Sequence, residues 1–149
     1  VWESTIPVHV RRRELRGDSG GDGTWRGGLG QVLELSSPHA ERWIANMMTD
    51  RVHHPARGVE GGRAGAAGVV LVNGEPAASK GRILLGPDDV VRIETPGGGG
   101  FGPPGERDPA LVARDVRDGV VSAERAREVY GVVVRDDGSY ERTTTGGGR

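Results

Sequence analysis

Apolar and polar residues alternate in several short segments, and a period of two predicts β-strands. The first such segment runs over residues 5–10, and Pro7 places it at a sheet edge or near a strand start because proline has no N–H to donate. Further strands are predicted over residues 31–35, 42–49, 69–72, 82–85 and 90–94. Asn73-Gly74 favours the positive φ angles of a type I′ turn. We therefore expect residues 69–94 to form a β-meander.

The pattern changes to helical spacing in the last third of the chain. Asp108 followed by Pro109 is a favourable helix start, and Ser122 is a candidate cap for a second short helix. Gly119 and Gly131 suit the two helix ends. Residues 132–134 and 140–143 flank an Asp-Gly pair and predict a terminal hairpin.

These elements predict a mostly β (α+β) protein. Residues 1–107 form an antiparallel, meander-like or sandwich-like β domain with glycine-rich loops. Residues 108–142 form a helical pair and a hairpin packed on that domain. The polar, glycine-rich tail over residues 143–149 is expected to be disordered.

Composition narrows the class of protein. The 149 residues include 27 glycines and no cysteine, and the formal net charge is -1. Disulfides, thiolate zinc sites and a cysteine nucleophile are therefore excluded, and a balanced charge gives no field that would draw the chain to nucleic acid or anionic lipid. No apolar run is long enough for a membrane span, and nothing at the start is typical of a signal peptide. A cytoplasmic bacterial protein is expected, and because the sequence starts at Val1 and not at Met, the chain is expected to be either processed or cut from a longer one.

The segment over residues 95–102 is the most unusual. Gly97, Gly98, Gly99 and Gly100 could expose N–H groups to an anion. No Lys-Ser/Thr follows, as a phosphate-binding Walker loop requires, and two prolines stand where a dinucleotide-binding helix would open. A loop packed against other backbone is therefore the favoured interpretation. The only phenylalanine, Phe101, is expected to anchor this loop in the core.

Few other residues suggest chemistry. Arg51 and Arg57 lie in a glycine-rich region and could hold a carboxylate or phosphate, or form loop-anchoring ion pairs. The adjacent His53 and His54 match no metal-ligand spacing, so no metal site is predicted. The basic cluster at residues 11–13 is expected to be a solvated edge strand. No catalytic residue can be named, because no nucleophile elbow or acid/base carboxylate pair is recognisable.

Taken in order, several motifs resemble the C-terminal end of the hydantoinase B/oxoprolinase family. They are Glu3–Val8, Asp18–Gly30, Asp50-Arg51, Gly58–Gly62, Asp89–Gly102 and Asp115–Val133. The resemblance implies a subunit of an ATP-dependent enzyme that hydrolyses cyclic amides such as 5-oxoproline or N-methylhydantoin. It also implies a hetero-oligomer with a hydantoinase A-type partner that holds the nucleotide. This segment would bind no cofactor itself, although the whole enzyme would use ATP and a divalent metal.

Two alternatives remain. Related complexes carboxylate ketones, so the chain could belong to a ketone carboxylase subunit. From a different class, a non-catalytic β-module could bind a protein or carbohydrate through Trp25 or Trp43. In either enzyme interpretation, the isolated segment is expected to be inactive.

Overall fold

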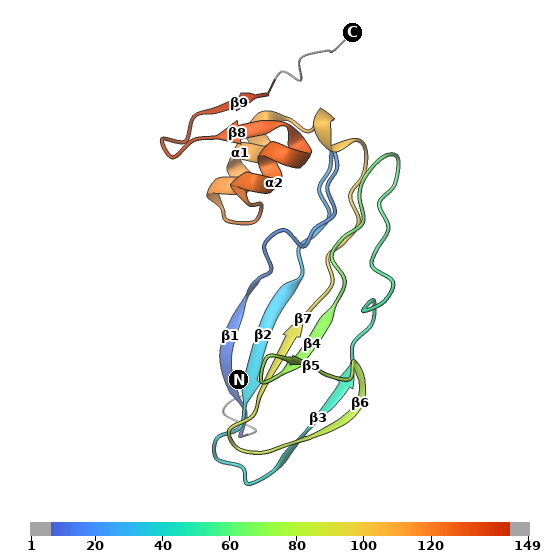
Figure 1. Cartoon of the computed structure of the whole chain (residues 1–149), viewed down its shortest axis with the longest axis vertical. Coiled ribbons are helices and arrows are strands. Elements are labelled where there is room, and N and C mark those ends of the chain that lie inside the picture. The colour runs from blue at the N-terminus through green and yellow to red at the C-terminus, as the bar shows by residue number, and fades with distance from the viewer. Residues whose placement is uncertain (1–6, 144–149) are drawn as a thin grey trace.

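The computed structural model describes residues 7–143. Figure 1 shows an elongated molecule with most of its strands at one end, two short helices and a terminal hairpin at the other, and long stretches of irregular chain between them. Every pair of named strands is antiparallel, and the protein is mostly β, as predicted. No helix within residues 7–143 is long and apolar enough to cross a membrane.

Five strands form the main sheet in the order β1-β2-β7-β4-β5. Their bounds are His9–Leu15 (β1), Gln31–Ser36 (β2), Val90–Glu94 (β7), Val69–Val72 (β4) and Glu75–Pro76 (β5). Leu35, Val91 and Val72 stand opposite one another across three neighbouring strands. Because directly opposed side chains on a sheet pack together, this apolar row stabilises the sheet.

A second, two-stranded sheet pairs β3, Trp43–Met48, with β6, Lys80–Leu85. Met47 and Leu85 are buried, and Trp43 Nε1 donates a hydrogen bond of 2.7 Å to the carbonyl of Gly86. The strands expected within residues 69–94 are thus present, but their order differs from a simple meander. β6 leaves to pair with β3, and β7 returns between β2 and β4.

The first strand is not where the alternation placed it. β1 begins at His9, after Pro7 and Val8, and residues 5 and 6 lie outside the described part of the chain. β1 is an edge strand that pairs only with β2 among the described strands, and Arg11, Arg12 and Arg13 are exposed along it. The solvated edge strand predicted for residues 11–13 is thus confirmed, whereas the apolar alternation ended at residue 10 because an exposed edge strand has no strict apolar alternation.

The turn predicted at Asn73-Gly74 is confirmed. Both residues have positive φ, 52° for Asn73 and 86° for Gly74, and they connect β4 to β5. The Asn73 side chain also donates to Asp89 over 2.7 Å and accepts from the Val90 N–H over 2.9 Å. It therefore ties this turn to the start of β7, whose first residue is Val90.

Three glycine-rich segments, residues 19–30, 56–68 and 96–102, lie side by side beyond one end of the main sheet (Figure 1). We call them the glycine bundle. Backbone hydrogen bonds join all three segments: the Gly21 N–H donates to Gly98 over 2.8 Å, Arg63 to Asp22 over 2.7 Å, and Gly100 to Arg63 over 2.9 Å. The chain enters or leaves the bundle at β1, β2, β4 and β7, so the sheet sets how the three segments meet.

The helices form a small unit with its own apolar core. This unit contains a 3₁₀ turn over Pro104–Glu106, α1 over Pro109–Arg117, α2 over Ala123–Tyr130, and the hairpin of β8, Val132–Val134, with β9, Tyr140–Arg142. Its core side chains are Val112, Val121, Ala126, Tyr130 and Val132. The domain boundary at residue 107 stays a prediction.

The predicted helix ends are confirmed. Asp108 accepts a hydrogen bond from the Ala110 N–H, and Ser122 accepts one from Arg125. Gly119 and Gly131 have φ of 68° and 64°, the left-handed conformation that favours glycine after a helix. The disorder expected over residues 143–149 falls almost entirely outside the described residues, which end at residue 143.

Candidate functional site

The glycine run at residues 97–100 is packed against backbone. The N–H of Gly97 donates to Ala66 over 3.0 Å, that of Gly98 to Gly28 over 2.9 Å, and that of Gly100 to a carbonyl in the neighbouring segment. Three of these four N–H groups are therefore already bonded to carbonyls and do not face an anion. The geometry supports the packing interpretation of this run.

The glycines are required by space. A Cβ at Gly97 would lie 1.8 Å from the Ser19 oxygen, and one at Gly99 would lie 2.0 Å from the Arg57 oxygen. Both distances are far inside van der Waals contact, and both obstacles are backbone atoms held by neighbouring segments. The bundle is thus made by close backbone approach, which only glycine permits at these positions.

The two arginines proposed for anion binding do not share one site. Arg57 lies in the glycine bundle, where its carbonyl contacts Gly99 and its side chain is exposed. Arg51 lies just after β3, and its carbonyl accepts a hydrogen bond of 3.0 Å from Gly68. Anion binding by either arginine stays a prediction, but the structure assigns the two side chains to different surroundings.

Arg51 lines a pocket of about 270 Å³. The pocket, called the Arg51 pocket below, is formed by residues 49–54 and by Ser79 and Lys80. The two segments are joined by the Thr49 N–H, which donates to Ser79 over 2.9 Å, and by an ion pair of 2.8 Å between Lys80 and Asp50. The hydrogen bond and the charge of Lys80 lower the pKa of Asp50, so this carboxylate is ionised at neutral pH.

His53 and His54 also line the Arg51 pocket, and both are exposed. Within residues 7–143, no group of three or more His, Cys, Asp or Glu side chains is arranged to hold a metal ion. The absence of a metal in this segment stays a prediction. The pocket nevertheless contains hydrogen-bond donors from residues that are far apart in the sequence. Lys80 lies beside the residues that follow β3 because β6 pairs with β3.

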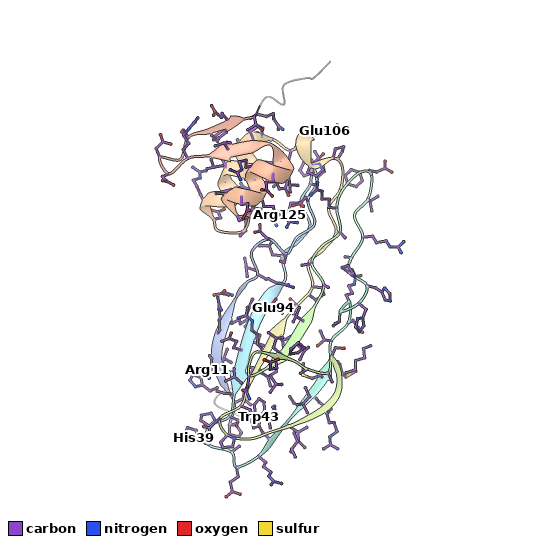
Figure 2. All side chains as sticks on the ribbon, viewed as in Figure 1. Arg11, His39, Trp43, Glu94, Glu106 and Arg125 are labelled. Atoms are coloured by element: carbon purple, nitrogen blue, oxygen red, sulfur yellow. The ribbon has the colours of Figure 1, made fainter. Side chains whose placement is uncertain are left out.

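Sequence reasoning missed a cluster of buried charges between the glycine bundle and the helical unit. Arg125, labelled in Figure 2, forms two hydrogen bonds of 2.8 Å with Asp22, whose side chain is 1% exposed. Asp115 on α1 binds both Arg26, at 3.1 Å, and Arg107, at 2.9 Å. Paired, hydrogen-bonded geometry is what makes burial of such charges tolerable.

The same cluster fixes how the two parts of the protein meet. Asp22 and Arg26 come from the glycine bundle, and their partners Arg125 and Asp115 lie on α2 and α1 of the helical unit. The hydrogen bond with Asp22 raises the pKa of Arg125, and burial, helped by the Asp22 charge, raises the pKa of Tyr130. Asp22 could have been suspected from sequence only as a charged residue inside an otherwise glycine-rich segment.

Phe101 does not anchor its loop in the core, and this prediction is wrong. Its side chain is 50% exposed, and it lies beside Trp25, 65% exposed, and Val59, 55% exposed. Backbone bridges hold the three residues together: Phe101 and Trp25 exchange two hydrogen bonds of 2.9 Å. Close backbone contact fixes the loop, so the aromatic ring is left on the surface.

Replacing Phe101 with alanine should therefore lower the free energy of unfolding by only about 1 kcal/mol, because a half-exposed ring loses little burial. The matched change Tyr130→Ala removes a fully buried aromatic ring and should cost about 3 kcal/mol or more. Urea denaturation of both variants tests this difference. Equal losses would show that Phe101 is buried in solution.

Comparison with known proteins shows the family of this chain. Residues 1–104 match the family described as Hydantoinase B/oxoprolinase. This chain belongs to that family. It is 36% identical to the caprolactamase subunit beta of Pseudomonas jessenii over 97% of this chain and 26% of that protein. The first curated relatives are thus about four times as long as the chain.

Two solved structures share the fold of this family member. The nucleotide-free structure of acetone carboxylase matches with a TM-score of 0.76 and 26% identity, over 94% of this chain and 24% of that one. The ATP-dependent caprolactamase from Pseudomonas jessenii matches with a TM-score of 0.72 and 29% identity, over 92% and 25%. The resemblance inferred from the ordered motifs is confirmed.

Proposed function

We propose that the chain is the C-terminal part of a subunit of an ATP-dependent cyclic amidase that acts with a hydantoinase A-type partner. The observation that supports this most is the similarity to caprolactamase subunit beta, which runs along nearly the whole chain. Caprolactam, hydantoins and 5-oxoproline are all cyclic amides. An amide carbonyl is poorly electrophilic, and coupling to ATP supplies the activation that hydrolysis needs.

The role proposed for this segment is structural. The glycine bundle supplies a rigid backbone platform, and the ion pairs of Asp22 and Asp115 hold the helical unit against it. Trp25, Val59 and Phe101 leave an apolar surface on the bundle, a feature associated with contacts to other protein. The catalytic groups, ATP and the divalent metal would then lie in the remainder of the assembly, in the cytoplasm where ATP is available.

Ketone carboxylation is the second candidate. It is favoured by the TM-score of 0.76 with acetone carboxylase, which is slightly higher than that with caprolactamase. The fold therefore does not distinguish cyclic-amide hydrolysis from ketone carboxylation, and only an activity assay can distinguish them.

The test is to co-express the complete subunit with its partner and supply ATP with caprolactam, 5-oxoproline, N-methylhydantoin, or acetone plus bicarbonate. We expect a ring-opened product to form together with ADP and phosphate: a free amino acid from either lactam, and an N-carbamoyl amino acid from N-methylhydantoin. Ring opening that proceeds equally without ATP would contradict the proposal. Carboxylation of acetone without any ring opening would replace it with the second candidate.

The isolated 149-residue chain should neither hydrolyse ATP nor open these rings, because its sequence has no Walker motif and no nucleophile elbow. Steady-state assays of the purified chain, with the complete complex as the positive control, measure this directly. Turnover by the isolated chain that is lost on a point mutation within it would show that catalytic residues lie in this segment.

A further inference from the structure

The Arg51 pocket contains an unbalanced positive charge. Asp50 is the only carboxylate that lines the pocket, and it is ion-paired with Lys80, so two cations, Lys80 and Arg51, face a single carboxylate. Within the described part of the chain, the side chains of Arg51, His53 and His54 form no hydrogen bond and no ion pair within 4 Å with protein groups. The donors of all three side chains remain available to a ligand.

Arg51 also holds an unfavourable backbone conformation. Its φ is 55°, in the left-handed region that a long side chain rarely adopts. At two of the other three such positions in residues 7–143, the residue is an Asp or Asn, which tolerate this region more readily. A glycine would fit the Arg51 backbone better, so the fold alone does not explain an arginine here.

The pocket is small, and carbon atoms form most of its lining surface, so its few polar groups are its only specific donors. Its volume of about 270 Å³ lies just below the range of sites for drug-sized ligands. Thr49 and Ser79, whose side chains are neutral hydroxyls, are also among the lining residues. A guanidinium presents a planar fork of donors that matches the oxygens of a carboxylate or a phosphate.

We propose that the Arg51 pocket binds a small oxyanion, a carboxylate or a phosphate. Arg51 is the principal ligand-binding residue, and the ring N–H groups of His53 and His54 and the ammonium of Lys80 are further donors. This site does not depend on which reaction the complete enzyme performs. Its ligand chemistry would suit either a free carboxylate metabolite or inorganic phosphate.

The experiment titrates the ¹⁵N-labelled chain at pH 7 and low ionic strength with sodium acetate or sodium phosphate, with sodium chloride as the reference. We expect saturable shifts of the amides in residues 49–54 and 79–80 with at least one oxyanion. Saturation by acetate alone identifies a carboxylate site, and saturation by phosphate alone identifies a phosphate site. Chloride should produce only small shifts that do not saturate.

Arg51→Gln should weaken the binding at least tenfold, whereas Arg13→Gln, which removes an exposed arginine from β1, should leave it unchanged. Arg51→Gly separates binding from stability: it relieves the positive φ, so the Tm should be equal or higher while binding is lost. The proposal is overturned if neither oxyanion gives saturable shifts. It is also overturned if the shifts persist at full strength in Arg51→Gln or Arg51→Gly.

Discussion

Gly97→Ala should lower the free energy of unfolding by about 3 kcal/mol or more, enough to leave much of the chain unfolded at 37 °C. The added methyl would lie 1.8 Å from the Ser19 oxygen. That oxygen cannot move away cheaply, because it accepts a hydrogen bond of 2.8 Å from the Ala66 N–H in a different segment of the bundle. Relief of the clash at one position would therefore break a contact at another.

The matched control is Gly28→Ala in the same bundle. A Cβ at Gly28 meets nothing within 4 Å, and the residue is exposed. This change should leave stability unchanged or raise it by about 0.5 kcal/mol, because alanine has less freedom than glycine in the unfolded chain. Urea denaturation of both variants gives the comparison. Similar midpoints would mean that the glycine bundle is open in solution, and they would revive the interpretation of residues 97–100 as an exposed anion-binding loop.

Local signals predicted the parts of the fold that depend on local physics. The sequence predicted the helix caps at Asp108 and Ser122, the glycines that end both helices, and the turn at Asn73. Each of these features depends on residues that are only a few positions apart. The order of strands was not found in full. Pairing of β3 with β6 joins residues more than thirty positions apart, and nothing in the alternation of β6 distinguishes β3 from β4 as its partner.

The glycine segments show a different limit. Their composition indicated tight packing, and the run at residues 97–100 is indeed packed. The partner that fixes it could not be read from the sequence, because backbone atoms of any residue can fill that role. The usual expectation that an isolated aromatic residue anchors a loop therefore failed for Phe101. For the same reason, Arg51 and Lys80 could not be placed in one pocket before the pairing of β3 with β6 was known.

Asp115→Asn should lower the free energy of unfolding by about 3 kcal/mol, a loss similar to that expected for removing a buried core side chain of the helical unit. The substitution keeps the shape of the side chain but removes the charge that Arg26 and Arg107 share. The Arg107 side chain is only 7% exposed, so its charge would be left buried without a counter-ion. Asp118→Asn, at the exposed end of the same helix, is the control and should change stability by less than about 0.5 kcal/mol.

A second change distinguishes charge from packing at this junction. If the loss comes from the stranded guanidinium, the double variant Asp115→Asn/Arg107→Met should be more stable than Asp115→Asn alone, because an apolar side chain of similar length needs no counter-ion. Urea denaturation of the two single variants, Asp115→Asn and Arg107→Met, and of the double variant gives a double-mutant cycle. If the two losses simply add, Arg107 contributes independently of Asp115. In that case the helical unit would be held on the glycine bundle by other contacts, and the ion pairs would form only because that packing brings their charges together.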